Sequence, residues 1–178
     1  SASLVGSEMC IRDRVAALCD LNEELLDRES KKYGIKKAFR VFEDMLADDI
    51  DAVVIATPMQ LHVAQAIAAL QAGKHVLSEV TAGVSMEELW WLVETVEQSG
   101  KVYMMAENYC YIPQVQLIQN MVDQGLFGEV YFGEGEYLHE LKDLAFYQDG
   151  RVSWRSYWQL GRRGNFYPTH SIGPVSYT

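Results

Sequence analysis

A tyrosine and a histidine stand three residues apart near the end of the chain, in the segment Tyr167-Pro168-Thr169-His170. Because proline restricts the backbone, a phenol and an imidazole in this segment can be presented as a fixed pair. Either group can move protons at a sugar or hydroxy-acid centre. The alternative is a proline-bearing turn with an exposed histidine, and these four residues alone do not decide between the two interpretations.

Polar side chains also stand at the ends of four apolar runs of the chain. Because the carboxyl ends of parallel strands meet at one edge of a sheet, we expect these side chains to lie along that edge, where open α/β sheets bind ligands. Carboxylate, hydroxyl and amide groups there can hydrogen-bond the ribose and the carboxamide of a nicotinamide dinucleotide. The residues are Asp20, Thr57, Glu79 with Val80, and Asn108, at the ends of residues 15–20, 52–58, 75–80 and 102–108.

Two residues near this edge have more than one interpretation. Asp20 stands where a Rossmann unit places an acid on the adenosine ribose, and a carboxylate there favours NAD over NADP because it repels a 2′-phosphate. Asp20 can instead cap the helix that follows it. His62 is expected in the first turn of the next helix after Pro58, where it either faces the cleft or serves as a capping or solvated histidine.

The elements that must position these residues alternate between strand and helix. Apolar runs of strand length are followed by segments of helical period, which predicts βαβ units and a Rossmann-type parallel sheet with helices on both faces. Ser85 and Glu88 form a capping box at the start of one helix, and glycines follow the others. The expected helices are residues 22–33, 61–72, 85–98 and 112–124.

The pattern changes after Gly125. Residues 129–143 alternate along a length too great for one short parallel strand, which predicts the first strand of an antiparallel sheet in an α+β domain, followed by a loop-like stretch at 144–166. We expect a non-native or disordered leader and a fragment cut at both ends. The expected domains are the leader at 1–14, a Rossmann domain without its first βα unit at 15–124, and the start of a substrate and oligomerisation domain at 125–178.

The composition disfavours several classes of protein. Of 178 residues, 49% are hydrophobic and 22% are charged, so a sizeable core is possible and wholesale disorder is not. A net charge of −10 disfavours a nucleic-acid partner, because an acidic surface repels phosphate backbones. Three cysteines without metal-like spacing predict neither a disulfide framework nor a metal site. No apolar stretch approaches the ~20 residues that span a bilayer.

From Val15 to Thr178 the chain resembles the Gfo/Idh/MocA family of nicotinamide-dependent oxidoreductases. The resemblance rests on AVVIATP followed by His62, on HVLSEV, on a strand ending in Glu107-Asn108, and on GLFGEV at 125–130. It implies an N-terminal Rossmann domain and a C-terminal open sheet, through which the full-length protein forms a homo-oligomer. Most dehydrogenases of the family carry Glu-Lys-Pro where this chain has Glu79-Val80-Thr81, so a simple alcohol dehydrogenase is disfavoured. The usual Asp-x-x-x-His pattern is absent as well, because Phe166 stands four residues before His170.

These departures are similar to one branch, the family 109 glycoside hydrolases. The features shared with that branch are Glu79-Val80, Tyr111 after the Glu-Asn strand, Trp154-Arg155, and YPTHSIGP, in which Ser171 replaces a glycine. The branch retains NAD and works by transient oxidation at sugar C3, removal of the C2 hydrogen, elimination of the C1 aglycone, addition of water and return of the hydride. Redox glycosidases of this kind do not use the paired carboxylates of ordinary glycosidases.

The resemblance therefore implies an NAD-dependent glycosidase acting on alpha-N-acetylgalactosaminides, a small-molecule or glycan substrate. An NAD(P)-dependent sugar or polyol dehydrogenase and a non-catalytic sugar-binding relative are the alternatives. The parent protein is either exported or cytoplasmic. The implied NAD contacts are Asp20, Thr57, Met59, Gln60, Leu61, His62, Glu79, Val80, Asn108 and Tyr167. The implied substrate contacts are Tyr137, Arg155, Tyr167, Pro168, Thr169 and His170, and the candidates for proton transfer are Tyr111, Tyr167 and His170.

Overall fold

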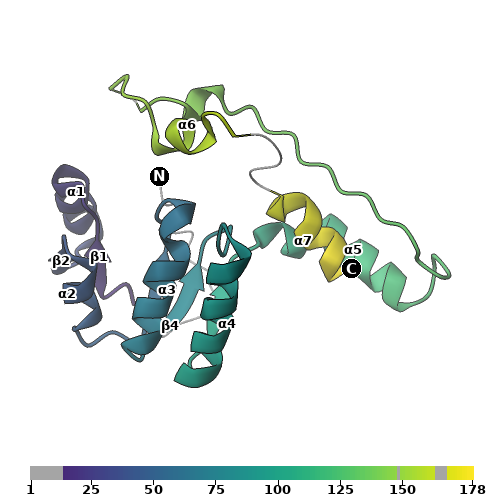
Figure 1. Ribbon diagram of the computed structural model, residues 1–178, viewed down its shortest axis with the longest axis horizontal. Coiled ribbons are helices and arrows are strands. Elements are labelled where there is room, and N and C mark those ends of the chain that lie inside the picture. Colours follow the sequence, from purple (N-terminus) through teal and green to yellow (C-terminus); the bar gives the residue numbers. More distant parts are fainter. Residues whose placement is uncertain (1–13, 148, 163–167) are drawn as a thin grey trace.

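The structure of the chain is a computed structural model that describes residues 14–147, 149–162 and 168–178 (Figure 1). Strands and helices alternate through the first two thirds of the chain, which confirms the predicted α/β class. The first elements are β1 (Ala17–Cys19), α1 (Glu23–Tyr33), β2 (Lys37–Phe39), α2 (Phe42–Leu46), β3 (Ala52–Ile55), the 3₁₀ helix η1 (Met59–Leu61) and α3 (His62–Gln71). They are followed by β4 (His75–Ser78), α4 (Met86–Ser99), β5 (Tyr103–Met105), η2 (Asn108–Tyr111), α5 (Pro113–Asp123), η3 (Lys142–Leu144), α6 (Trp154–Gln159) and α7 (Thr169–Tyr177).

The strands form two parallel sheets. β1 pairs with β2, and β4 lies between β3 and β5, with Val53 opposite Val76 and Val76 opposite Tyr103. No pairing joins β1 to β3 in the described part of the chain. The order β2-β1 and then β3-β4-β5 matches the strands on either side of the switch point of a doubly wound sheet, which is where such sheets bind ligands.

The main core lies between β3-β4-β5 and the helices α3 and α4. Ile55 and Leu70 are almost fully buried in it, and Leu92 of α4 closes the same cluster. Side chains of a strand alternate between faces, and on the opposite face Val54 is 65% exposed and Met104 46%. Helices therefore cover only one face of these three strands within the described residues, whereas the sequence predicts cover on both.

The helices α1 and α4 begin where local chemistry predicts, and α1 also ends there, whereas β2 and α2 were not among the expected elements. Asn22 caps α1 by accepting a hydrogen bond from the Leu25 N–H, and the Ser85–Glu88 capping box opens α4. Gly34 ends α1 with φ +67°, a conformation that side-chain-bearing residues rarely adopt. None of the described helices combines the length and the apolarity needed to cross a bilayer.

The second half of the chain differs from the prediction. Residues 130–141 run as an extended segment without strand pairing, so the strand expected at 129–143 is wrong for the described structure (Figure 1). A strand is defined by hydrogen bonds to a neighbour, and no described segment supplies them here. The segment instead lies along α7, where Gly135 comes so close that a Cβ there would meet Ser171 O at 2.6 Å. The stretch expected to be loop-like contains α6.

We expect Leu70→Ala to destabilise the fold by about 2–5 kcal/mol, because it leaves a cavity between α3 and the sheet. Leu70 is 1% exposed. The matched variant Leu117→Ala removes the same atoms from a residue of α5 that is 59% exposed, and should cost less than about 0.5 kcal/mol. Urea unfolding measures both. Equal midpoints for the two variants would contradict this assignment of the core.

Candidate active site

Four side chains from three separate segments of the sequence meet just beyond the carboxyl end of β5. The His170 ring, in the first turn of α7, places Nδ1 2.8 Å from Oε1 of Glu107. The same ring stacks on Tyr109 of η2, with centroids 4.2 Å apart and an interplanar angle of 22°. Tyr137, from the extended segment, meets His170 edge-on at 4.8 Å and Tyr109 edge-on at 5.4 Å. A carboxylate and two phenol rings therefore hold the imidazole.

Glu107 and α7 come together because one residue of the helix has no side chain. A Cβ on Gly173 would lie 2.8 Å from Cγ of Glu107 and 3.5 Å from Sγ of Cys110. Oε1 of Glu107 also accepts a hydrogen bond from the Tyr109 N–H at 3.0 Å, which fixes the carboxylate at the start of η2. The glycine in YPTHSIGP thus permits the close approach on which the cluster depends.

The protonation of Tyr137 limits what it can do. Burial raises the pKa of the Tyr137 phenol, the nearby Tyr109 and Glu107 raise it further, and Arg155 opposes the shift. At neutral pH the phenol is therefore protonated, and Tyr137 can donate a hydrogen bond. Imidazole is the side chain that most often serves as a general base in enzymes, so His170 suits that role.

The structure brings together part of the predicted substrate and proton-transfer set. Tyr137 and His170 touch, and Pro168 and Thr169 form the start of the helix that carries His170. Arg155 of α6 lies 4.7 Å from the Trp154 ring and is close enough to Tyr137 to act on its phenol. Tyr167 lies outside the described residues.

Tyr111 does not lie in this cluster. It is 58% exposed, and its ring pairs with Tyr177 at 5.8 Å. Tyr109 stacks on His170 in its place. Both tyrosines follow Glu107-Asn108 within four residues, and no local pattern distinguishes them, so the sequence analysis missed Tyr109. The contact between Glu107 and His170 was not predicted either, because the two residues are 63 positions apart in the sequence.

The predicted NAD contacts lie at the carboxyl ends of the strands. Asp20 and Glu79 are exposed after β1 and β4, and Asn108 is exposed after β5. The Thr57 hydroxyl, after β3, is 2.6 Å from Oε1 of Gln65. The idea that Asp20 caps α1 is wrong, because Asn22 is the cap and donates its own N–H to Oδ1 of Asp20 at 2.7 Å. Contact of these residues with NAD stays a prediction.

His62 stands in the first turn of α3 as expected, but its ring does not face a cleft. The residue is 1% exposed, with Nδ1 2.7 Å from Thr81 O and Nε2 2.8 Å from Thr57 O. His62 therefore joins the turns that follow β3 and β4, which is neither a solvated nor a capping role. Nearby, Met59 and Val80 are buried, Gln60 is half-buried, and Leu61 is 43% exposed. The peptide bond from Val80 to Thr81 is cis.

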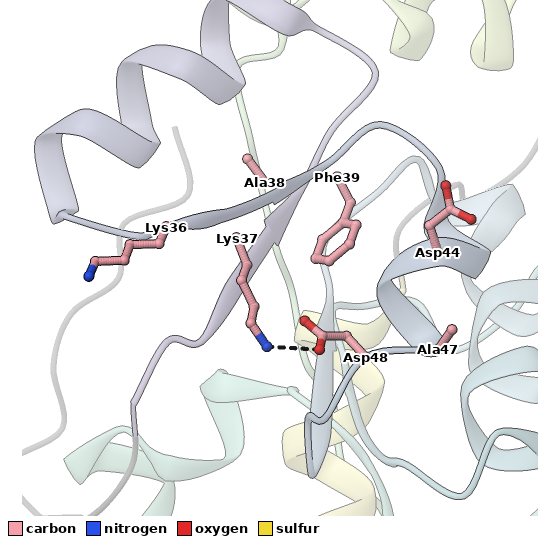
Figure 2. Close-up of a pocket in the computed structure, with 7 residues that line it drawn as sticks. All are labelled: Lys36, Lys37, Ala38, Phe39, Asp44, Ala47 and Asp48. Atoms are coloured by element: carbon pink, nitrogen blue, oxygen red, sulfur yellow. Dashed lines mark hydrogen bonds and ion pairs between the residues drawn. The ribbon is translucent and has the colours of Figure 1, made fainter.

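A hollow of about 470 Å³ lies elsewhere, between β2 and α2 (Figure 2). It is shallow and open. Across it, Nζ of Lys37 is 2.8 Å from Oδ1 of Asp48, and this hydrogen bond lowers the pKa of the Asp48 carboxyl. The cation and the anion neutralise each other, and none of the predicted site residues lines the hollow, so we place the candidate site at His170 instead.

Neither a metal site nor a disulfide is found in the described part of the chain. No group of three His, Cys, Asp or Glu side chains there is arranged to hold a metal ion. Cys19 and Cys110 are free thiols, and burial raises the pKa of both, which makes them poor nucleophiles.

Two known families match the two parts of the chain. Residues 5–107 match the oxidoreductase family Gfo/Idh/MocA, NAD-binding Rossmann fold, and residues 111–178 match the C-terminal domain of glycosyl hydrolase 109. The first match begins inside the expected leader, and the matches meet near residue 110, not at 124–125. The expected division into domains stays a prediction.

Curated relatives point to the same branch. A glycosyl hydrolase family 109 protein of Shewanella pealeana is 40% identical over 91% of this chain and 38% of its own length. An alpha-N-acetylgalactosaminidase of Shewanella oneidensis is 39% identical over 90% of this chain and 37% of its own length. The chain thus spans less than two fifths of the length of these relatives.

Solved structures share the fold. The scyllo-inositol dehydrogenase of Lactobacillus casei with bound NAD(H) and scyllo-inositol superposes with a TM-score of 0.62 and 30% identity, over 65% of this chain and 35% of that one. The WlbA dehydrogenase of Bordetella pertussis, in complex with NADH and UDP-GlcNAcA, superposes with a TM-score of 0.62 and 33% identity, over 65% of this chain and 36% of that one. An NAD-binding oxidoreductase from Klebsiella pneumoniae superposes with a TM-score of 0.73 and 25% identity, over 91% of this chain and 43% of that one.

We expect Gly173→Ala to separate α7 from Glu107. Alanine favours a helix over glycine by about 1 kcal/mol, so a net loss of stability would have to come from the contact with Glu107. We expect that loss to be about 1–3 kcal/mol, the usual cost of overpacking. Ser176→Ala, on the exposed side of the same helix, is the control. Thermal unfolding compares the two, and a Gly173→Ala variant more stable than the wild type would contradict the close approach.

Proposed function

The chain belongs to the Gfo/Idh/MocA oxidoreductase family, and from this premise we propose that it is part of an NAD-dependent glycoside hydrolase. The observation that carries the proposal is the His170 imidazole, held against the Glu107 carboxylate and two phenol rings beyond the carboxyl end of β5. The match of residues 111–178 to the family 109 C-terminal domain supports a glycosidase over other members of the family. The name of the Shewanella oneidensis relative supports alpha-N-acetylgalactosaminides as substrates.

The residues of the carboxyl edge fit NAD. The chain carries an NAD-binding Rossmann domain. The exposed carboxylates of Asp20 and Glu79 and the exposed amide of Asn108 offer acceptors and donors that suit ribose hydroxyls and a carboxamide. NAD bound there would supply a hydride acceptor for a sugar carbon and later a hydride donor. Asp20 would exclude NADP by charge repulsion with its 2′-phosphate.

The side chains beyond β5 supply the proton transfers that such chemistry needs. Oxidation of a sugar alcohol requires that its hydroxyl lose a proton, and elimination requires a base for the hydrogen next to the new ketone. His170 is the proposed base. Tyr137, whose phenol is protonated, donates a hydrogen bond to the substrate, and the Arg155 guanidinium supports the sugar from α6.

A sugar or polyol dehydrogenase is the second candidate, because the solved inositol dehydrogenase shares the fold. Glu79-Val80-Thr81 lacks the lysine that most dehydrogenases of the family carry at this place, which favours the glycosidase.

Full-length protein, taken as this chain with the further residues that its relatives carry, should release p-nitrophenol from p-nitrophenyl alpha-N-acetylgalactosaminide without net formation of NADH. Because p-nitrophenol and NADH absorb at different wavelengths, absorbance measures both products in one cuvette. Stoichiometric NADH formation on free polyols would favour the dehydrogenase instead. Sugar binding without turnover would favour a non-catalytic relative.

His170→Ala in the same full-length protein should lower kcat by about 10²–10⁴-fold, the usual contribution of a proton-transfer group, with NAD still bound. Exchange of the substrate C2 hydrogen with deuterated solvent should fall in parallel. Ser176→Ala, on the same helix, should exchange at the wild-type rate. Wild-type exchange in a folded, NAD-loaded His170→Ala protein would refute a chemical role for His170.

A further inference from the structure

Glu107 belongs to neither the expected NAD contacts nor the expected substrate contacts, yet its Oε1 lies 2.8 Å from Nδ1 of His170. The carboxylate and the imidazole are both nearly buried, with side chains 6% and 9% exposed. Oε1 receives the Tyr109 N–H and faces Nδ1 of His170, while Oε2 is buried and makes no hydrogen bond among the described residues. A buried carboxylate is costly unless hydrogen bonds compensate it, so a purely apolar contact would pack α7 at lower cost.

The chemistry of the pair determines where the proton of the imidazole lies. A carboxylate only accepts hydrogen bonds, so the nitrogen that faces Oε1 must carry a hydrogen. In the neutral ring of His170 the proton is then on Nδ1, and Nε2 is the nitrogen with a lone pair. In this tautomer Nε2 can accept a proton, so His170 can remove a proton from a substrate that lies next to Nε2.

The surrounding rings fix the orientation that goes with this tautomer. The Tyr109 ring covers one face of the imidazole at 4.2 Å, and Tyr137 contacts it edge-on. Gly173 allows α7 to approach until Glu107 reaches the ring. Rotation of the imidazole by half a turn would break the contact between Nδ1 and the carboxylate.

We propose that Glu107 is the positioning residue of His170: it holds the imidazole in the Nδ1–H tautomer and directs Nε2 toward the substrate as the proton acceptor. The orientation and tautomer follow from this chain alone. Their consequence for turnover rests on the function proposed above.

A second histidine of the chain provides an internal reference. Nδ1 of His75 accepts a hydrogen bond from the Val102 N–H at 3.0 Å, so its neutral ring carries the proton on Nε2. His75 and His170 should therefore show opposite tautomers in one spectrum.

The experiment is a long-range ¹H–¹⁵N correlation spectrum of this chain, labelled at histidine, at a pH where the rings are neutral. Signals are assigned with His75→Gln and His170→Gln. We expect the Nδ1–H pattern for His170 and the Nε2–H pattern for His75. Glu107→Met, which removes the acceptor but keeps the length, should abolish the Nδ1–H pattern of His170 and leave His75 unchanged. Glu107→Gln, whose amide oxygen still accepts, should retain it. Glu97→Met, at an exposed position of α4, is the matched control.

An Nε2–H ring at His170 in the wild type would overturn the proposal, and this measurement does not depend on whether Glu107→Met folds. An unchanged Nδ1–H pattern in folded Glu107→Met would overturn it as well. In full-length protein, Glu107→Met should lower kcat by roughly 10²-fold with NAD affinity unchanged, and Glu107→Gln should restore most of the rate. An Nδ1–H ring in a protein that releases no aglycone would contradict the proposed function and support the positioning role.

Discussion

The hydrogen bond between Glu107 and His170 joins the α/β part of the chain to the segments that follow it. Glu107 is placed by β5 and η2, and His170 by α7, 63 residues later. Removing one partner of a buried hydrogen bond leaves the other polar group unsatisfied, which typically costs about 1–3 kcal/mol, so each half of this contact depends on the other. Without it, the ring contacts with Tyr109 and Tyr137 would remain, but neither determines which nitrogen of the imidazole faces Glu107.

The α/β core supplies the rigid frame for this contact. Three adjacent parallel strands end at one edge, and α3 and α4 bury their inner face through Ile55, Leu70 and Leu92. His62 strengthens the same edge, because its ring lies between the carbonyls of Thr57 and Thr81. The residues proposed to meet NAD therefore project from turns that the core and a buried imidazole hold in place, as pre-organised binding requires.

The proposed chemistry divides between the two parts of the chain. The strand ends carry exposed carboxylates and an amide, which suit the polar groups of a dinucleotide, whereas the cluster beyond β5 carries groups that move protons. A glycosidase that works through oxidation needs both at neighbouring places, and it does not need the pair of carboxylates that ordinary glycosidases place across the scissile bond.

Local chemistry in the sequence determined the helices with clear caps and the strand ends of the α/β part. Asn22, Ser85 and Gly34 act through groups within a few residues of themselves, and apolar runs mark strands whatever lies beside them. Only the tertiary structure decided which tyrosine stacks on His170 and which carboxylate faces it. Tyr109 and Tyr111 have equivalent sequence neighbours, and the approach of α7 through Gly173 selects the first. The extended segment at 130–141 is a second case that the sequence could not decide. Its alternating pattern predicts a strand, but strand pairing depends on a partner segment that no local pattern supplies.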